Sequence, residues 1–210
     1  MVLMENHSTL MKAHNNQIWD FASENPVFNN LFNYSMACTT KIVMKAVVTA
    51  YKDGFGCIRT LVGVGGGTRG TIAKLVKVYP HIKGINFDVP YVLALALAYE
   101  ETQFGWHYTN ISHVKGDMFK SIPNADAIFM KNDENCIKIL KNCRKAIPKK
   151  TGKIIIVDAL LFNLVMIAHN INEKERTEVE WKKLLEEGGF LRYRILKTST
   201  LPMIIEAYLE

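Results

Sequence analysis

The sequence predicts an α/β fold: a doubly wound sheet with helices on both faces, preceded by helices at the N-terminus. Three observations support this prediction. Short apolar runs alternate with amphipathic stretches along most of the chain, as expected for a parallel sheet covered by helices. A glycine-rich turn, Gly65-Gly66-Gly67, joins one apolar run to the amphipathic stretch that follows it. Polar residues follow several apolar runs, and in such sheets the carboxyl ends of the strands line the ligand crevice.

The first elements along the chain are expected to be helices. Helical periodicity covers Leu10 to Ala22 and Ser35 to Tyr51, and Asn25-Pro26 breaks the pattern between them because proline does not fit a helix interior. The sequence therefore divides into an N-terminal helical segment, residues 1–53, and a sheet domain, residues 54–210.

The sheet domain begins with a strand, the glycine turn and a helix over Thr71 to Tyr79. Near the C-terminus, Thr177 and Glu180 form a variant of the helix capping box, and Gly188-Gly189 ends that helix. Phe190 to Leu196 and Met203 to Tyr208 then read as a closing pair of strands. The preceding strands are expected at Ile58 to Val64, Lys83 to Phe87, Ile111 to Lys115, Ala125 to Met130 and Lys153 to Ala159.

Composition limits the classes of function. Of 210 residues, 49% are hydrophobic, which is enough for a well-buried core. The net charge of +6 comes from lysines spread along the sequence, which favours a solvated surface over a nucleic-acid site. No apolar run reaches the length of a membrane span, and the N-terminus lacks a secretory pattern, so the cytoplasm is expected. The cysteines form no CxxC pair and lack histidines at zinc-ligand spacing, so we expect reduced thiols and no metal site.

The glycine turn and a second motif indicate a nucleotide. Gly65, Gly67 and Gly70 have the spacing of the dinucleotide fingerprint, and Asp88 follows at the distance of a ribose-binding carboxylate. That pattern alone would also fit a nicotinamide-dependent oxidoreductase. Gly116-Asp117-Met118-Phe119 follows the third expected strand. A carboxylate there can accept a hydrogen bond from an adenine amino group, and a thioether packs well on a flat ring. This combination favours an adenosine ligand without a second nucleotide, although Met118 and Phe119 could also be ordinary core residues.

At this point the chain resembles the plant O-methyltransferases that act on phenolic small molecules such as caffeic acid, flavonoids, isoflavones and benzylisoquinoline alkaloids. The resemblance runs from about Trp19 to Tyr208, and its blocks follow one another in the family's order. The blocks are Trp19 to Pro26, Leu61 to Thr68, Asn86 to Pro90, Gly116 to Pro123, Ala125 to Lys131, Cys136 to Cys143, Gly152 to Asp158 and Lys174 to Thr177.

This resemblance implies a Rossmann-like methyltransferase sheet, S-adenosylmethionine as the cofactor and a phenol or alkaloid as the methyl acceptor. The cofactor-binding positions would be Gly65, Asp88, Val89, Asp117, Met118 and Lys131. The substrate-lining positions would be Phe28, Phe32, Met36, Met166 and Asn170. An aromatic acceptor calls for such an apolar wall, although a Phe and Met stripe at helical spacing is more often core.

The chain also departs from the family's pattern. After Lys131 the family continues with a Trp-x-x-His-Asp-Trp segment, whereas here Asn132 follows directly, so the catalytic histidine has no counterpart. The two carboxylates that orient this histidine in the family match Asp158 and Glu175. Arg69 is inserted into the glycine turn, and a second gap lies between Asp158 and Met166. The family's N-terminal dimerisation domain is also expected to be missing.

Two interpretations therefore stay open beside the oxidoreductase. The chain is an O-methyltransferase, active or residual, or it is a catalytically impaired relative. In the second case it binds the cofactor as a regulator, pairs with an intact homologue, or is the translation of an incorrectly assembled gene. Since family members bury their first helices against a partner subunit, a homodimer or heterodimer is expected, with Phe21 and Leu31 among the apolar side chains that need such cover.

Overall fold

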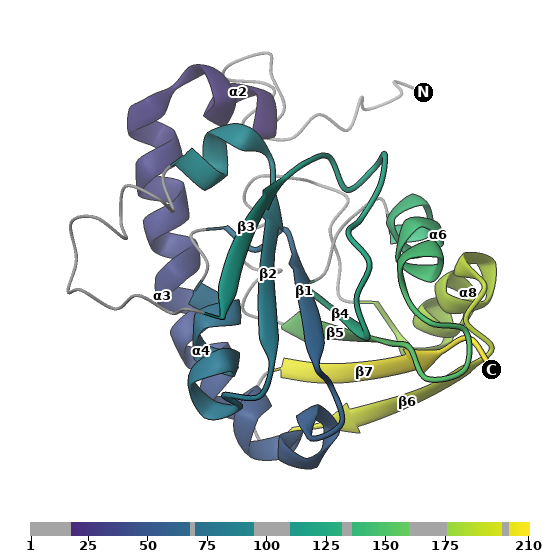
Figure 1. The fold of residues 1–210 in the computed structure, drawn as a ribbon. Helices are drawn as coiled ribbons and strands as arrows, with labels where there is room; N and C mark the ends of the chain where they lie inside the picture. The colour runs from purple at the N-terminus through teal and green to yellow at the C-terminus, as the bar shows by residue number, and fades with distance from the viewer. Residues whose placement is uncertain (1–17, 68–69, 95–109, 132–135, 160–175, 199–201) are drawn as a thin grey trace, which may run out of the picture.

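The computed structural model describes residues 18–67, 70–94, 110–131, 136–159, 176–198 and 202–210. A seven-stranded sheet runs through the molecule, with helices on both of its faces (Figure 1). The strands are β1 (Thr60–Val64), β2 (Lys83–Asp88), β3 (Ile111–Lys115), β4 (Ala127–Lys131), β5 (Lys153–Ala159), β6 (Arg192–Lys197) and β7 (Pro202–Tyr208). The helices are α2 (Ile18–Glu24), α3 (Pro26–Ala50), the 3-10 helix η1 (Lys52–Phe55), α4 (Gly70–Val78), α6 (Cys136–Ala146) and α8 (Glu178–Gly188).

The strand order, β3-β2-β1-β4-β5-β7-β6, confirms a doubly wound sheet with a closing strand pair. Strands β1 to β5 are parallel, and β7 runs antiparallel to both β5 and β6. From β1 the chain first builds outward to β2 and β3, and then returns to the other side of β1 with β4. Ligands of such sheets bind at this switch point, beyond the carboxyl ends of the strands.

Three strands begin two residues later than the sequence predicted. β6 starts at Arg192 rather than Phe190. β1 starts at Thr60 rather than Ile58, and β4 starts at Ala127 rather than Ala125. At β1 and β4 a side chain explains the difference: the Asp126 carboxylate accepts hydrogen bonds from the backbone N–H groups of Arg59 and Thr60, at 3.0 and 2.9 Å. These residues are held by a side chain before the ladder between the strands begins.

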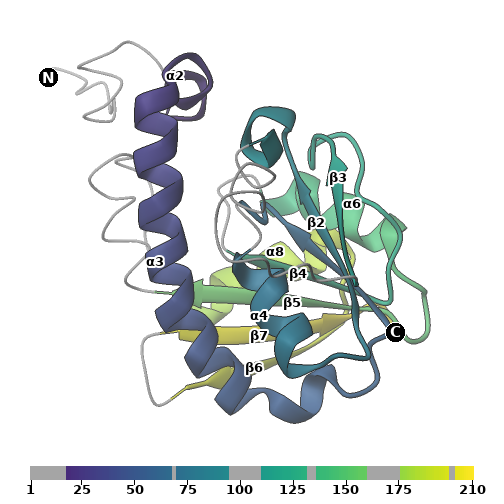
Figure 2. The ribbon, with the colours of Figure 1, turned by 60° about the vertical axis from the view of Figure 1, so that its left-hand side comes forward.

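The helices form one layer on each face of the sheet. α3 and α4 lie on one side, and α6 and α8 lie on the other (Figures 1 and 2). Strand side chains alternate between the two layers as the pleat requires. In β5, for example, Ile154 and Ile156 belong to the core cluster beneath α6 and α8, whereas Ile155 and Val157 belong to the cluster beneath α3 and α4.

The N-terminal helices differ from the prediction in their bounds. The break at Asn25-Pro26 is confirmed, but the second helix starts at Pro26 and not at Ser35. Asn25 caps this helix by accepting a hydrogen bond from the Phe28 N–H at 3.0 Å. Proline fits the first helical position because the N–H that it lacks would have no partner within the helix there. The first helix extends to Glu24, and the predicted helical residues 10–17 lie outside the described residues.

The predicted limits of the last helix are confirmed. The Thr177 side chain accepts from the Glu180 N–H, and the Glu180 carboxylate accepts from the Thr177 N–H at 2.8 Å, which completes a capping box. Gly189 follows the helix in the left-handed region, with φ of 85°. Within the described residues, no helix is long and apolar enough to cross a membrane.

A buried charge cluster joins the end of α3 to the sheet. The Glu206 side chain on β7 is 1% exposed and lies 2.9 Å from the Lys153 ammonium and 2.5 Å from the Arg194 guanidinium. The hydroxyl of Tyr51 donates to the same carboxylate. Burial alone would raise the pKa of Glu206, but hydrogen bonds from Tyr51, Lys153 and Tyr208 and the charge of Lys153 outweigh it and lower the pKa to about 2.

Candidate functional site

The glycine turn after β1 is held by the end of β2. Gly65 and Gly67 both adopt positive φ, 61° and 58°, which residues with a side chain rarely do. The Gly67 N–H donates to Oδ2 of Asp88 at 2.8 Å, and the Gly66 N–H donates to the Phe87 carbonyl at 3.3 Å. Because Oδ1 of Asp88 accepts the Val89 N–H at 2.7 Å, this carboxylate fixes both the turn and the start of the next loop.

The second wall of the site follows β3. The Gly116 N–H donates to the Asp88 carbonyl at 3.0 Å, which places the start of the Gly116-Asp117-Met118-Phe119 motif beside the end of β2. A Cβ atom at Gly116 would stand 2.4 Å from the buried Phe87 ring, so this position has no room for a side chain. Oδ1 of Asp117 accepts the Phe119 N–H at 2.9 Å and shapes the motif as a turn.

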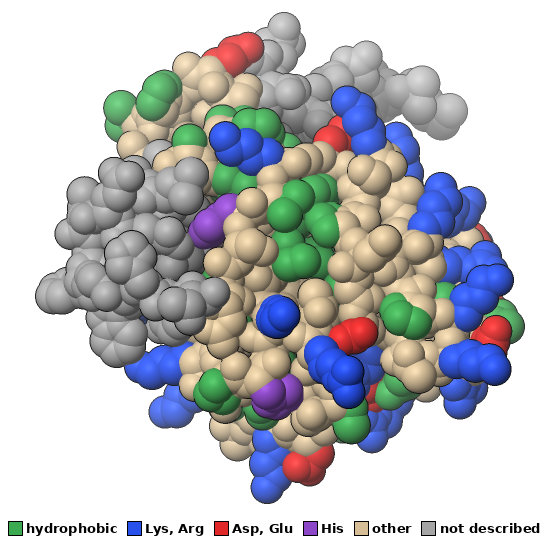
Figure 3. Space-filling model, viewed as in Figure 1, with side chains coloured by type: hydrophobic (Ala, Val, Ile, Leu, Met, Phe, Trp, Pro, Cys, Tyr) green, Lys and Arg blue, Asp and Glu red, His purple; other side chains and the backbone are tan. Residues whose placement is uncertain are grey.

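These two walls enclose one pocket. It holds about 250 Å³ of empty space, open solvent included, and is lined by Gly65, Phe87, Asp88, Val89, Gly116, Asp117, Met118 and Phe119. On this side of the molecule, Figure 3 shows hydrophobic side chains gathered near the middle of the face, and lysines and arginines along the edge formed by α6 and α8. Five of the six cofactor positions predicted from the sequence therefore line a single pocket at the carboxyl ends of the strands.

The chemistry of the pocket fits an adenosine. The Asp88 and Asp117 carboxylates are acceptors for ribose hydroxyls and for an adenine amino group, and Met118 and Phe119 offer apolar surface to a flat ring. A Cβ atom at Gly65 would meet nothing within 4 Å, so the backbone is open for close approach by a ligand. The sixth predicted position, Lys131, ends β4 in register with Val157, and its side chain lies outside the described residues.

The predicted substrate wall is only partly described. Phe28 and Phe32 are half-buried on α3, and their rings stack with centroids 6.0 Å apart, while Phe21 of α2 meets Phe28 edge-on at 4.9 Å. Met36 is half-buried one turn further along α3. Met166 and Asn170, predicted to face these residues, lie outside the described residues.

Sequence reasoning missed three asparagines around the pocket. Asn33 of α3 is buried and lies 4.0 Å from where a Cβ atom of Gly67 would stand. Asn142 of α6 donates to the Met118 carbonyl at 2.9 Å, and Asn86 of β2 donates to the Gly67 carbonyl at 3.0 Å. In the sequence, these three residues could have been noticed as polar side chains at positions where the helix or strand pattern calls for a buried residue.

Of the two carboxylates predicted to orient the histidine, the structure describes Asp158 but not Glu175. Asp158, near the end of β5, is 2% exposed and accepts a hydrogen bond from the indole N–H of Trp181 at 2.9 Å, which joins the strand to α8. Arg176 lies over the face of the same indole, 5.3 Å from the centroid. Glu175 lies outside the described residues, as does the Asn132 junction where the family's histidine segment is expected.

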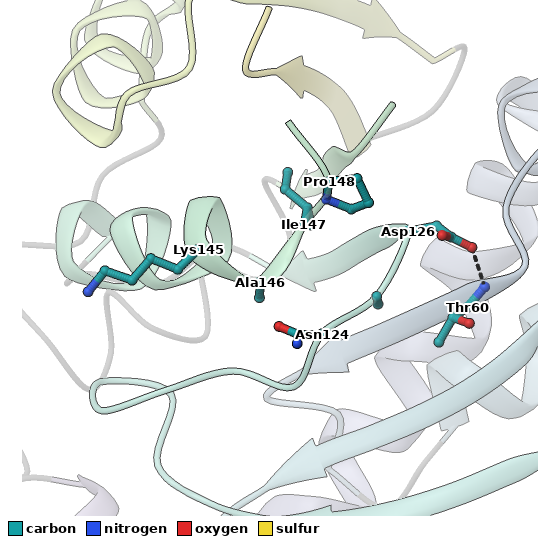
Figure 4. A pocket seen from close by; sticks show the side chains of 8 residues that line it. Thr60, Asn124, Asp126, Lys145, Ala146, Ile147 and Pro148 are labelled. Atoms are coloured by element: carbon teal, nitrogen blue, oxygen red, sulfur yellow. Dashed lines mark hydrogen bonds between the residues drawn. The ribbon is translucent and has the colours of Figure 1, made fainter. Parts of the chain in front are cut away.

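A larger hollow lies at the opposite edge of the sheet. It holds about 740 Å³, open solvent included, and is lined in part by Thr60, Asn124, Asp126 and Lys145 (Figure 4). It faces the amino ends of β1 and β4, away from the edge where doubly wound sheets bind ligands. Because of this position, we assign the hollow no ligand.

The described part of the structure holds no group of three or more His, Cys, Asp or Glu side chains that could bind a metal ion. Cys38 and Cys57 are exposed free thiols, and Cys143 is buried on α6 without a disulfide.

Comparison with known proteins adds to this geometry. The family model described as an O-methyltransferase domain matches residues 2–191. Desmethylxanthohumol 6'-O-methyltransferase from Humulus lupulus is 47% identical over 96% of this chain and 61% of its own length. (R,S)-reticuline 7-O-methyltransferase from Papaver somniferum is 45% identical over 98% and 62%. This chain therefore spans about three fifths of the length of these curated relatives.

Solved structures agree on the fold. The crystal structure of LaPhzM superposes with a TM-score of 0.84 at 28% identity, covering 96% of this chain and 64% of that one. Human N-acetylserotonin methyltransferase, solved in complex with SAM, superposes with a TM-score of 0.83 at 20% identity, covering 97% and 63%. The second likeness speaks for the fold alone.

Proposed function

This chain belongs to the O-methyltransferase family, and from that premise we propose that it binds S-adenosylmethionine in the cytoplasm and methylates an oxygen of a phenol or alkaloid. One observation carries the proposal: the motifs after β1, β2 and β3 build a single pocket with the acceptors and apolar surface that an adenosine requires. In this proposal residues 54–210 hold the cofactor, and residues 1–53 face the acceptor and a partner subunit.

The cofactor would supply a methyl group on a sulfonium centre. The residues of this chain would hold the adenosine at Asp88, Val89, Asp117 and Met118, and the backbone of Gly65 would face the methionine moiety. Transfer forms a bond between the acceptor oxygen and the methyl carbon and breaks the bond between that carbon and sulfur. The proton of the acceptor hydroxyl must also leave, and at neutral pH only about one phenol in a thousand has already lost it.

The proposed chemistry therefore depends on a base. Neither Asp158 nor His113 is placed to act as that base. Asp158 is buried and accepts a hydrogen bond from Trp181. His113 lies on β3 and contacts Asn86 on β2, at the side of the sheet away from β4. The alternative proposal follows from this: the chain binds the cofactor but transfers methyl groups slowly, as a regulator or as the partner of an intact homologue. Loss of a general base typically costs about a hundred- to ten-thousand-fold in rate.

Calorimetric titration tests cofactor binding. We expect S-adenosylmethionine and its demethylated product, S-adenosylhomocysteine, to bind more tightly than NAD, and Asp88→Asn to weaken S-adenosylhomocysteine about ten- to a hundredfold, the value of a charge-assisted hydrogen bond. Asp126→Asn is the matched control, because Asp126 also accepts two backbone N–H groups but at the opposite edge of the sheet. Tighter binding of NAD, or an equal loss in both variants, would refute the assignment of the pocket.

A labelled-methyl assay separates the active enzyme from the impaired relative. We expect a version with the Trp-x-x-His-Asp-Trp segment inserted after Lys131 to methylate a panel of catechols, flavonoids and alkaloids at least about a hundredfold faster than this chain. Residual activity of this chain should rise with pH and favour acceptors of low phenolic pKa, since their phenolate needs no base. Equal rates for the two proteins would show that this chain uses another base.

We also propose that the chain pairs through α3, with a second copy as the partner. Val27, Leu31, Tyr34 and Ile42 are 79%, 65%, 62% and 66% exposed, and their spacing places them along one side of the helix. Exposed apolar surface of this kind is typical of subunit interfaces. Light scattering should show a dimer that Leu31→Glu dissociates, while Val179→Glu on α8, an equally exposed apolar position, leaves it intact. A dilution-stable wild-type monomer would refute the dimer.

A further inference from the structure

We propose that Asn86 is a positioning residue for the cofactor pocket: its side-chain amide sets the orientation of the Gly67 peptide and, through it, the affinity for adenosine ligands. Asn86 does not line the pocket. It lies in the buried interior of β2, one pleat repeat before Asp88, so the two side chains leave the strand on the same face. The proposal rests on the proposed function of the pocket.

Asn86 and Asp88 both form hydrogen bonds with the same residue of the turn, Gly67. Nδ2 of Asn86 donates to the Gly67 carbonyl at 3.0 Å, and Oδ2 of Asp88 accepts the Gly67 N–H at 2.8 Å. Gly67 needs this support because glycine adopts positive and negative φ about equally readily, so the residue alone does not keep its φ at 58°. Fixing both polar groups of Gly67 also fixes where the backbone of Gly65 and Gly66 points at a ligand.

The other half of the Asn86 amide argues against a role in stability alone. Asn86 is fully buried, and among the described residues its Oδ1 has no hydrogen-bond partner. A buried carbonyl oxygen without a partner destabilises a fold, whereas an apolar side chain of similar size at the same place would not. The oxygen also lies where a Cβ atom of Gly66 would stand, at 1.9 Å, so the amide and the turn are closely fitted.

The Gly67 carbonyl sets the orientation of the amide, and a side chain of the neighbouring strand lies beside it. Nδ2 of Asn86 lies 3.3 Å from Nδ1 of His113, its partner in the β2–β3 register. With Nδ2 shared between the Gly67 carbonyl and this ring, a flipped amide would bring two carbonyl oxygens together at Gly67. The side chain therefore presents a donor to the turn.

The test compares affinity with stability in two Asn86 variants. Asn86→Leu removes the donor and the unpartnered oxygen, and Asn86→Asp puts a carboxylate against the Gly67 carbonyl. We expect both to bind S-adenosylhomocysteine about five- to tenfold more weakly than wild type by calorimetry, the value of one hydrogen bond. Asn86→Leu should nevertheless unfold at the wild-type temperature or higher. The control Asn110→Ala removes an Asn hydrogen bond of the same kind, Nδ2 to the Pro80 carbonyl at 2.9 Å, beside the amino end of β3, and should leave affinity unchanged.

Each outcome is decisive. Wild-type affinity in Asn86→Leu, or an affinity loss matched by an equal loss of stability, would assign Asn86 to the core and overturn the proposal, as would failure of both variants to fold. If the wild type itself binds no S-adenosylhomocysteine, the proposed function fails, and amide hydrogen exchange of the ligand-free proteins still tests the positioning. Asn86→Leu should speed the exchange of the Gly66 and Gly67 amides and leave exchange of the β1 amides unchanged. Unchanged exchange at Gly66 and Gly67 would overturn the proposal that Asn86 positions the turn.

Discussion

Replacing Glu206 by glutamine should destabilise the protein strongly at neutral pH and hardly at all in acid. Glu206 is the shared partner of Lys153, Arg194 and Tyr51, and its side chain is 1% exposed. Glutamine keeps the shape of the side chain but removes the negative charge. The Lys153 side chain, itself only 14% exposed, then remains beside the sheet without its counter-charge.

The lowered pKa of Glu206 gives the magnitude. The pKa falls from 4.5 to about 2 on folding, and each unit corresponds to about 1.4 kcal/mol, so the ionised carboxylate contributes about 3 kcal/mol. Because the folded-state pKa is the lower one, this contribution is complete above pH 4.5 and is lost as the pH falls toward 2. The difference in unfolding free energy between wild type and Glu206→Gln should follow the same course.

Urea unfolding at pH 7, 4.5 and 2.5 measures this difference. We expect about 3 kcal/mol at pH 7 and a steady decrease below pH 4.5. Glu186→Gln is the matched control: its partner Lys182 lies 4.0 Å away and both side chains are more than half exposed, so the loss should stay below about 0.5 kcal/mol at every pH. A Glu206→Gln loss below about 1 kcal/mol at pH 7, or one that does not change with pH, would refute the reasoning.

Three further changes test the site and its supports. Gly116→Ala places a Cβ atom 2.4 Å from the Phe87 ring, so it should cost about 1–3 kcal/mol in thermal unfolding and weaken S-adenosylhomocysteine by calorimetry; unchanged affinity would contradict the described wall. Thr177→Ala removes a capping box and should cost about 1 kcal/mol, whereas Thr49→Ala, whose hydroxyl donates to a carbonyl inside α3, should cost less. Trp181→Phe leaves Asp158 without the indole donor and should cost about 1–3 kcal/mol; a stability equal to wild type would show that this bond contributes nothing.

The sheet could be predicted from the sequence because each strand is a local pattern ended by a recognisable residue. β3 and β5 fall within their predicted limits, and the caps at Thr177 and Gly189 have the predicted geometry. The error at β1 came from an interaction across the chain. The Asp126 side chain accepts hydrogen bonds at the start of β1, and no local pattern at Arg59 indicates a partner 67 residues further on. The start of the second helix at Pro26, by contrast, had local signals in the Asn25 cap and the proline.

The pocket shows the same division. Gly65, Asp88, Asp117 and Met118 could be predicted because they belong to contiguous motifs at strand ends, and the structure brings them together. Asn86 and Asn142 could not be assigned to the site, because each donates to the backbone carbonyl of a residue distant in sequence. Asn33 donates to Asn29, four residues away, and the fold alone brings it near Gly67. A buried asparagine signals a hydrogen-bond partner but does not say which carbonyl it reaches.

The residues proposed for cofactor binding and those proposed for methyl transfer lie on different parts of this chain, and this makes the two functions separable by experiment. Every residue of the proposed adenosine pocket belongs to β1, β2 or β3 or to the turns that follow them, and these strands form one side of the sheet. The residues that the chemistry would need lie at the end of β5 or follow β4 and β5, on the other side: the Asn132 junction, Asp158 and Glu175. Under the proposed function, a chain that lacks the histidine segment after β4 lacks a base but keeps the hydrogen bonds that shape the glycine turn. A chain of this kind can therefore hold its cofactor while its transfer rate falls, and binding and rate must be measured as separate quantities.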